Sequence, residues 1–215
     1  MNILAIDAAG SQGGVAVLSG GGEVLARRLV ASQPGLVETL PGLLQACVDE
    51  AGVAIEAVAV TIGPGRFTGL RTAIALAQGY AAAAAVPVLG VRVDEAYAAG
   101  FALLHRPLWV ALRARKGRIF LIRDGLAEGF ADADIPRVKV PVALAGDAAN
   151  EVVSRLAAAG GDVLLTNAKV IDPVWVARAA LARLVAGLAP HAVLPVYVDP
   201  PEAKLPAGGL RPEPV

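Results

Sequence analysis

The segment 63–71 holds the residues best placed for anion chemistry. It reads Gly-Pro-Gly-Arg-Phe-Thr-Gly-Leu-Arg and joins an apolar, β-branched run to an alanine-rich helix that Thr68 is placed to cap. A helix N-terminus presents free N–H groups at the positive end of the helix dipole, so Gly63, Gly65 and Arg66 are candidates for a phosphate or partner contact. The Walker lysine is missing, however, and Gly-Pro-Gly also forms a sharp turn without any ligand. The residues alone leave both interpretations open.

Asp7 is a second candidate for nucleotide chemistry. It closes a predicted strand at 3–7, where proteins of the actin and sugar-kinase type place a carboxylate that orients a metal. Those proteins usually follow the aspartate with hydroxyl residues, whereas Ala8 and Ala9 stand here and only Ser11 offers an oxygen. Asp7 as a simple turn or cap residue is the alternative.

The chain shows no pattern typical of a nucleophile or a metal site. His105 and His191 are far apart, and no G-x-S-x-G serine is present. Cys47 is the only cysteine and lies on the apolar stripe of a predicted helix, which indicates a core residue. We therefore expect no catalytic residue and no metal ligand.

The only dense basic patch surrounds a predicted turn between strands at 108–113 and 118–123. Alternate residues of a hairpin share a face, so two of its arginines are expected to project together beside the turn. A solvated turn and a contact with tRNA phosphates are both compatible with this pattern. The patch consists of Arg113, Arg115, Lys116, Arg118 and Arg123.

Composition excludes several classes of protein. The 215 residues carry 19 basic and 19 acidic side chains, so overall positive charge cannot drive binding to nucleic acid. The single cysteine excludes a disulfide framework, and the chain starts without a charged leader, so we expect a cytoplasmic protein. The run 72–91 is uncharged, but it is mostly alanine and contains Gln78, Gly79 and Pro87, which argues against a membrane span.

The pattern of apolar residues predicts an α/β fold with a mixed sheet covered by helices. Two hairpins open the chain, and helices and strands then alternate. A proline-rich tail follows residue 195. The predicted strands are 3–7, 14–18, 23–30, 57–62, 88–91, 108–113, 118–123 and 138–144, and the predicted helices are 36–51, 67–84, 94–104, 150–159 and 173–188.

The segment 62–80 resembles the signature of the TsaB (YeaZ) family of bacterial glycoprotease-like proteins. Landmarks in the same order include the opening strand, Leu40-Pro41, the segments 87–91 and 114–120, Gly146-Asp147 and Pro195-Val-Tyr197. The resemblance implies an ASKHA fold of two ribonuclease-H-like lobes, the second of them reduced. We expect the lobes at residues 1–103 and 104–198, with a tail at 199–215.

The resemblance also implies a function. TsaB proteins bind the catalytic subunit TsaD, which installs threonylcarbamoyl on the adenosine 3′ of the anticodon in tRNAs that read ANN codons. The metal-binding histidine pair of TsaD matches Val93 and Tyr97, which cannot serve as its ligands. The resemblance thus implies a non-catalytic scaffold without a cofactor of its own. ATP and a metal would belong to TsaD-like and TsaE-like partners, and tRNA would be bound only through the complex.

In TsaB proteins the helices that match 36–51 and 67–84 pack against their counterparts in TsaD. In this chain Gly69, Ala73 and Ala77 recur every four residues, and Leu70 and Ile74 form a neighbouring stripe. Either these stripes face a partner, TsaD or a second copy of this chain, or they cover the protein's own sheet. The residues predicted to bind the partner are Leu36, Leu40, Phe67, Gly69, Leu70, Arg71, Ala73, Ile74 and Ala77.

Two departures from the family pattern precede the first helix and follow the late tyrosine. Gln33-Pro34-Gly35 replaces a histidine with serine or threonine, and Val198-Asp199 stands where arginine is common. The enzyme alternative is an independent ATP-binding phosphotransferase or metallopeptidase of the same fold.

Overall fold

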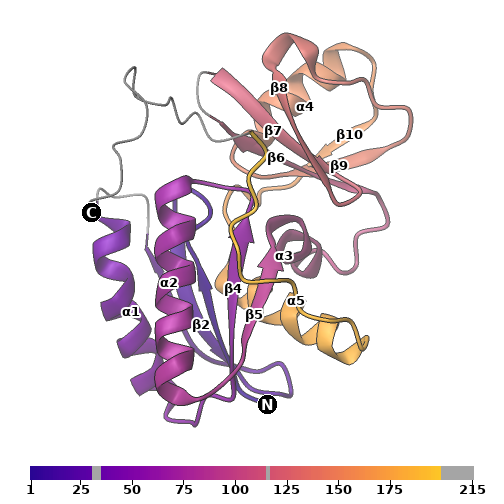
Figure 1. Ribbon diagram of the computed structural model, residues 1–215. Coiled ribbons are helices and arrows are strands. Elements are labelled where there is room, and N and C mark those ends of the chain that lie inside the picture. The colour runs from indigo at the N-terminus through magenta and orange to yellow at the C-terminus, as the bar shows by residue number, and fades with distance from the viewer. Residues whose placement is uncertain (31–34, 115–116, 200–215) are drawn as a thin grey trace, which may run out of the picture.

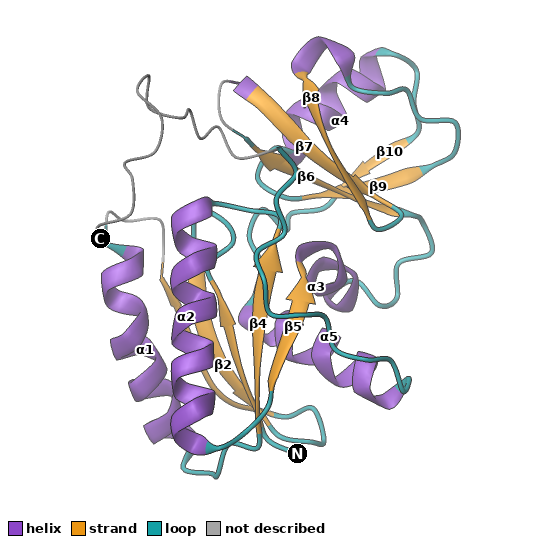
Figure 2. Cartoon of the chain, in the orientation of Figure 1, coloured by secondary structure: helices purple, strands orange, loops and turns teal. Residues whose placement is uncertain are grey.

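The computed structural model describes residues 1–30, 35–114 and 117–199. In it the chain forms two lobes, each built on a mixed sheet of five strands (Figures 1 and 2). Gln33, Pro34, Arg115, Lys116 and the tail from Pro200 onward lie outside the described residues.

The first sheet has the strand order β3-β2-β1-β4-β5. The first three strands in sequence form two antiparallel hairpins, and β4 and β5 run parallel to β1. The central strands are buried along their whole length, as expected of strands covered by helices on both faces. The strands are β1 (Ile3–Asp7), β2 (Gly13–Leu18), β3 (Val24–Val30), β4 (Ala57–Gly63) and β5 (Val88–Arg92).

Helices cover both faces of the first sheet (Figure 1). The helices α1 (Leu36–Ala51) and α2 (Phe67–Ala84) lie side by side on one face, where their apolar residues pack with those of β1 and β4. Cys47 is buried in this cluster, and burial raises the pKa of its thiol to about 11, so the prediction of a core cysteine is confirmed. The opposite face is covered by α3 (Val93–Gly100) and by α5 (Pro173–Val185), which returns from the second lobe.

The second sheet repeats the order of the first. Its strand order is β8-β7-β6-β9-β10. The strands β6, β7 and β8 form an antiparallel meander, and β9 and β10 run parallel to β6. Its own helix, α4 (Ala149–Ala158), packs on one face, and a short 3-10 turn, η2 (Asp132–Asp134), stands where the first lobe has α1. The strands are β6 (Leu108–Arg113), β7 (Arg118–Arg123), β8 (Leu126–Ala131), β9 (Val142–Ala145) and β10 (Val163–Leu165).

This duplicated topology is that of two ribonuclease-H-like lobes with a reduced second lobe, so the predicted fold class is confirmed. The pattern of apolar residues does not predict β8 or β10. It predicts a helix from residue 94 to residue 104, whereas α3 ends at Gly100. The proposed lobe boundaries stay predictions. By packing, α5 belongs with the first sheet, because the indole ring of Trp175 lies 6.0 Å from the ring of Tyr97 and 5.8 Å from that of Phe101.

Within the described ranges, no helix combines the length and the apolar character that crossing a membrane requires.

Candidate functional site

The glycines of the 63–71 loop allow it to pack closely against the turn after β1. A Cβ atom on Gly65 would collide with the carbonyl oxygen of Ala9, and one on Gly69 would collide with that of Ala8. The main-chain N–H of Arg66 donates to the same Ala9 oxygen at 2.8 Å. These contacts account for two glycines of the motif by packing, without a bound phosphate.

Asp7 is enclosed by its own chain. Its carboxylate is 1% exposed, and its Oδ1 accepts the Thr61 hydroxyl at 2.8 Å and the Ala9 N–H at 3.1 Å. Burial raises the pKa of Asp7 to about 6, although the hydrogen bonds from Thr61 and Ala9 lower it, and the negative charge of Asp172 adds to the rise. A carboxylate that stabilises the turn in this way is poorly placed to meet a hydrated metal.

The other residues predicted to contact a phosphate differ in how far solvent reaches them. Gly63 is buried, Ser11 and Gly65 are half-buried, and Arg66 is exposed. The fold brings the loop that contains Ser11 close to Gly65 and Arg66, but the alanines next to Asp7 supply no side-chain oxygen.

Most residues predicted to bind a partner lie inside the protein. Of the nine, only Leu36, Phe67 and Arg71 are accessible. Of the two alternatives for the stripes of α2, their packing favours the one in which they cover the protein's own sheet, and partner binding by these residues stays a prediction. These stripes pack on the protein's own sheet, so a charge placed at Leu70 or Ile74 would be buried in the core. The buried residues are Leu40, Gly69, Leu70, Ala73, Ile74 and Ala77.

The opposite side of the helices presents a second set of small residues, here called the outer face. Apart from the adjacent backbone of its own helix, a Cβ atom added at Gly42 or Gly79 would meet no atom of the described chain within 4 Å. The spacing of apolar residues does not reveal this face, because α2 has small residues on all sides. The sequence feature that points to it is a glycine in the middle of each helix, Gly42 in α1 and Gly79 in α2. The outer face comprises Gly42 and Ala46 of α1 with Ala75, Gly79 and Ala82 of α2, all exposed.

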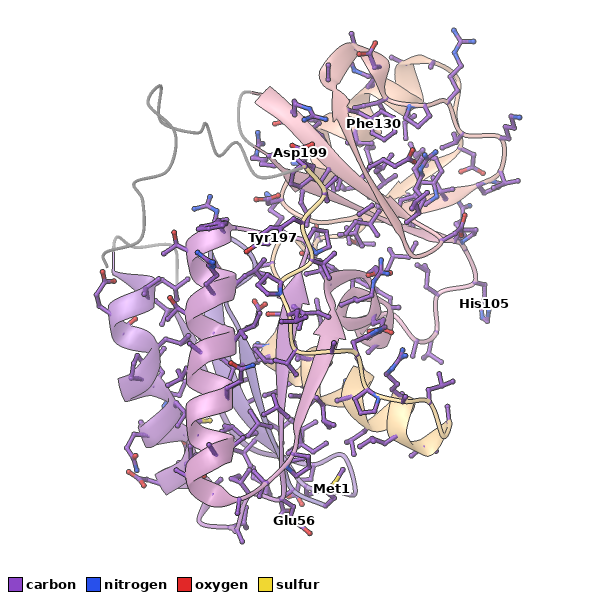
Figure 3. All side chains as sticks on the ribbon, in the orientation of Figure 1. Met1, Glu56, His105, Phe130, Tyr197 and Asp199 are labelled. Atoms are coloured by element: carbon purple, nitrogen blue, oxygen red, sulfur yellow. The ribbon has the colours of Figure 1, made fainter. Side chains whose placement is uncertain are left out.

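An aromatic stack marks the N-terminal end of α2. The rings of Phe67 and Tyr197 lie 5.8 Å apart, and each residue is 47% exposed. The Arg71 guanidinium lies 4.5 Å from the centre of the Phe67 ring. In Figure 3, Tyr197 lies beside the N-terminal end of α2, on the chain that rises toward the second lobe.

The described arginines of the basic patch all have partners within the chain. The Arg113 guanidinium pairs with Glu151, and the main-chain N–H of Arg113 donates to Oδ1 of Asp147 at 2.8 Å. Arg118 pairs with Asp199 at 2.8 Å. These pairings favour a folded structural role over an open phosphate-binding surface. The third arginine, Arg123, pairs with Glu128 and stacks on Trp109 and Phe130.

Val93 and Tyr97 are both buried. Burial, with Asp7 and Asp147 nearby, raises the pKa of the Tyr97 phenol, so this side chain stays neutral. Among the described residues, no three His, Cys, Asp or Glu side chains converge as a metal site would need. The absence of a metal of its own remains a prediction.

Solved structures with this fold include two from Pseudomonas aeruginosa. One is an uncharacterised protein with similarity to the peptidase YeaZ, with a TM-score of 0.75 and 23% identity, covering 92% of this chain and 99% of that one. The other is YeaZ, with a TM-score of 0.70 and 22% identity, covering 91% and 99%. The ethanolamine utilization protein EutJ from Carboxydothermus hydrogenoformans matches with a TM-score of 0.50 and 15% identity, covering 85% and 89%. These likenesses confirm the fold implied by the resemblance.

No curated protein matches the sequence. A family model does: the one described as TsaD, tRNA N6-adenosine threonylcarbamoyltransferase, matches residues 31–165, more than half of the chain. The chain therefore belongs to the family that this model describes.

Proposed function

We propose that this protein is a non-catalytic scaffold that binds a TsaD-like subunit through the outer face of α1 and α2. Bound there, it supports threonylcarbamoyl transfer to the tRNA adenosine 3′ of the anticodon. A TsaE-like ATPase joins the same cytoplasmic complex, and tRNA, ATP and the metal are bound by the partners.

The two outward glycines carry this proposal. Glycine inside a helix costs about 0.5–1 kcal/mol relative to alanine. Gly42 and Gly79 have open space where a side chain would stand, so packing within the chain does not account for them. The close approach of a partner's helices does account for them, because helices without side chains at the contact pack at shorter distances.

The loop after β1 supports a role without catalysis. The small residues there leave Ser11 as the one hydroxyl, and Asp7 is already held by Thr61 and Ala9. Val93 and Tyr97, which stand where the resemblance places the metal-binding histidines of TsaD, are buried and lack suitable donors. An independent phosphotransferase or metallopeptidase would need an accessible carboxylate or ligand set at this point.

The test is light scattering after size-exclusion chromatography, with TsaD from the same cell. The wild-type chain is expected to form a mixed peak that alone transfers threonylcarbamoyl to tRNA. Gly42→Arg and Gly79→Arg are expected to weaken this complex at least about 100-fold, because a long side chain would fill the contact. Both side chains have open space, so the fold should remain intact.

A matched control comes from the second lobe. Ala158→Arg places the same side chain on the exposed face of α4 and is expected to leave binding unchanged. The proposal fails if the two glycine variants bind TsaD as tightly as the wild type, or if the isolated chain transfers threonylcarbamoyl by itself.

A further inference from the structure

The chain after α5 crosses from one lobe to the other a third time. We call residues 189–199 the strap. It leaves the end of α5, passes β5 and β4, and reaches the second lobe beside the N-terminal end of α2 (Figure 1). The other two crossings are the segments 101–107 and 166–172, which enter and leave the second sheet.

The first sheet contains two glycines that make room for the strap. A Cβ atom on Gly90 would lie 2.9 Å from the carbonyl oxygen of His191 and 3.2 Å from that of Ala192. One on Gly63 would lie 2.9 Å from the carbonyl oxygen of Val196. Distances this short are rarely adopted by real side chains, so the strap lies where only glycine permits main chain to approach.

Main-chain hydrogen bonds hold the middle of the strap to the first lobe. Gly90 and His191 form an antiparallel bridge, and the N–H of Val196 donates to the Ile62 oxygen at 2.7 Å. The strap thus continues the edge of the first sheet and then turns inward to β4.

Side chains fasten both ends of the strap. At its start, Glu95 of α3 accepts Arg183 at 2.7 Å and lies 2.9 Å from Nε2 of His191. At its end, Arg118 of β7 donates to Asp199 at 2.8 Å, so the strap is tied to the second sheet. Between them Tyr197 stacks on Phe67, and Figure 3 shows Tyr197 and Asp199 along this path.

The lobes also contact each other through α3 and α5, where Val110 and Ile122 of the second sheet join the apolar cluster of the first lobe. The guanidinium of Arg92, at the start of α3, also donates to the carbonyl oxygen of Gly125 between β7 and β8. Contacts gathered around α3 in this way allow two lobes to rock about them, as hinged proteins do. We propose that the strap is a second, separate tie that fixes the angle between the lobes and so prevents hinge motion. This inference does not depend on which partner binds α1 and α2.

The test measures the distance between the lobes in solution by electron spin resonance. Spin labels are placed at Gln45→Cys on α1 and Ala157→Cys on α4, both exposed, in a Cys47→Ala background. The parent is expected to give one narrow distance distribution. Gly90→Ala, which pushes the strap from β5, is expected to broaden it and to speed exchange of the Val196 amide hydrogen by about tenfold or more.

A second variant tests the same proposal in case Gly90→Ala fails to fold. Tyr197→Ala combined with Asp199→Ala removes the ring stacking and the hydrogen bond to Arg118 at the second-lobe end of the strap, and leaves the first sheet unchanged. This double variant is expected to broaden the distribution as well. Glu50→Gln is the control, because it removes a carboxylate from an exposed ion pair with Arg28 inside the first lobe. The proposal is overturned if the strap amide exchanges faster while the interlobe distribution stays as narrow as in the parent.

Discussion

The two lobes share one strand order and differ in what covers it. The first sheet carries α1 and α2 on one face, whereas the second carries α4 and the short turn η2. The outward side of α2 is small and uncharged around Gly79, while that of α4 presents Glu151 and Arg155. The same framework thus carries a helix surface of small, uncharged residues in one lobe and a charged helix surface in the other.

The ends of the first strands differ in the same way. β1 ends in the buried carboxylate of Asp7, and its counterpart β6 ends in Arg113, which is exposed and paired with Glu151. A nucleotide cleft between two such lobes would need anion-binding and metal-orienting groups on both sides. The two sheets therefore end in side chains of opposite charge and different exposure at the place where their first strands face the same edge.

The largest effect is expected from adjacent residues on the two sides of α2. Ile74→Glu would bury a charge in the core and should lower the free energy of unfolding by about 4 kcal/mol. Ala75→Glu, one residue along on the outer face, should change it by less than about 0.5 kcal/mol. Urea denaturation measures both values. Equal losses for the two variants would contradict our assignment of the inner and outer sides.

Gly69→Val tests whether the signature motif serves packing. Its side chain would collide with the Ala8 oxygen, so the free energy of unfolding should fall by about 3 kcal/mol. Gly79→Ala, at a position with open space in the same helix, is the control. If Gly69→Val unfolds at the same urea concentration as the wild type, the close contact between α2 and the turn after β1 is wrong.

Asp7 should make the first lobe more stable in mild acid. Its pKa of about 6 in the folded state lies above the ordinary value of 3.8, so the ionised form is penalised by folding. This penalty, about 3 kcal/mol, is fully present above pH 6 and disappears as the pH falls toward 4. Asp7→Asn should remove this part of the pH dependence, as followed by urea denaturation from pH 4 to 7.5. The control is Asp49→Asn on the exposed side of α1, and the prediction fails if Asp7→Asn and wild type show the same pH profile.

The smallest effect concerns the outward glycines in the isolated chain. Gly42→Ala and Gly79→Ala should each raise the free energy of unfolding by about 0.5–1 kcal/mol, because alanine favours the helix and meets no neighbour. No glycine lies within α4, so that helix offers no glycine-to-alanine substitution that would raise the free energy of unfolding in this way. Thermal unfolding of the single and double variants measures the gain. A loss of stability in either would show that these glycines serve the chain's own packing.

Patterns of apolar residues predicted the framework well. The predicted helix 36–51 has the same first and last residues as α1. Asp172 caps α5 as predicted, because its side chain accepts the Val174 N–H at 3.0 Å. The missed strands had weak signals, because β8 contains Gly129 and lacks β-branched residues, and β10 has three residues only.

The spacing of residues along the sequence does not distinguish the inner side of α2 from its outer side. Small residues recur at helical spacing on both sides, so only the position of the sheet decides that Ala73 is inside and Ala75 outside. The enclosure of Asp7 likewise depends on Thr61, which is 54 residues away in sequence and pairs with it through the parallel contact of β1 and β4.

The chain has two tryptophans, and the fold places one in each lobe, Trp175 on a helix packed with the first sheet and Trp109 in the second sheet. Trp175 packs between α5 and α3 against the first lobe, and Trp109 lies on β6 under Arg123. Intrinsic fluorescence is thus divided between the two halves of the molecule. Variants that retain one indole, with phenylalanine at the other position, would report the melting of each half separately, and coincident transitions would mean that the halves unfold as one cooperative unit.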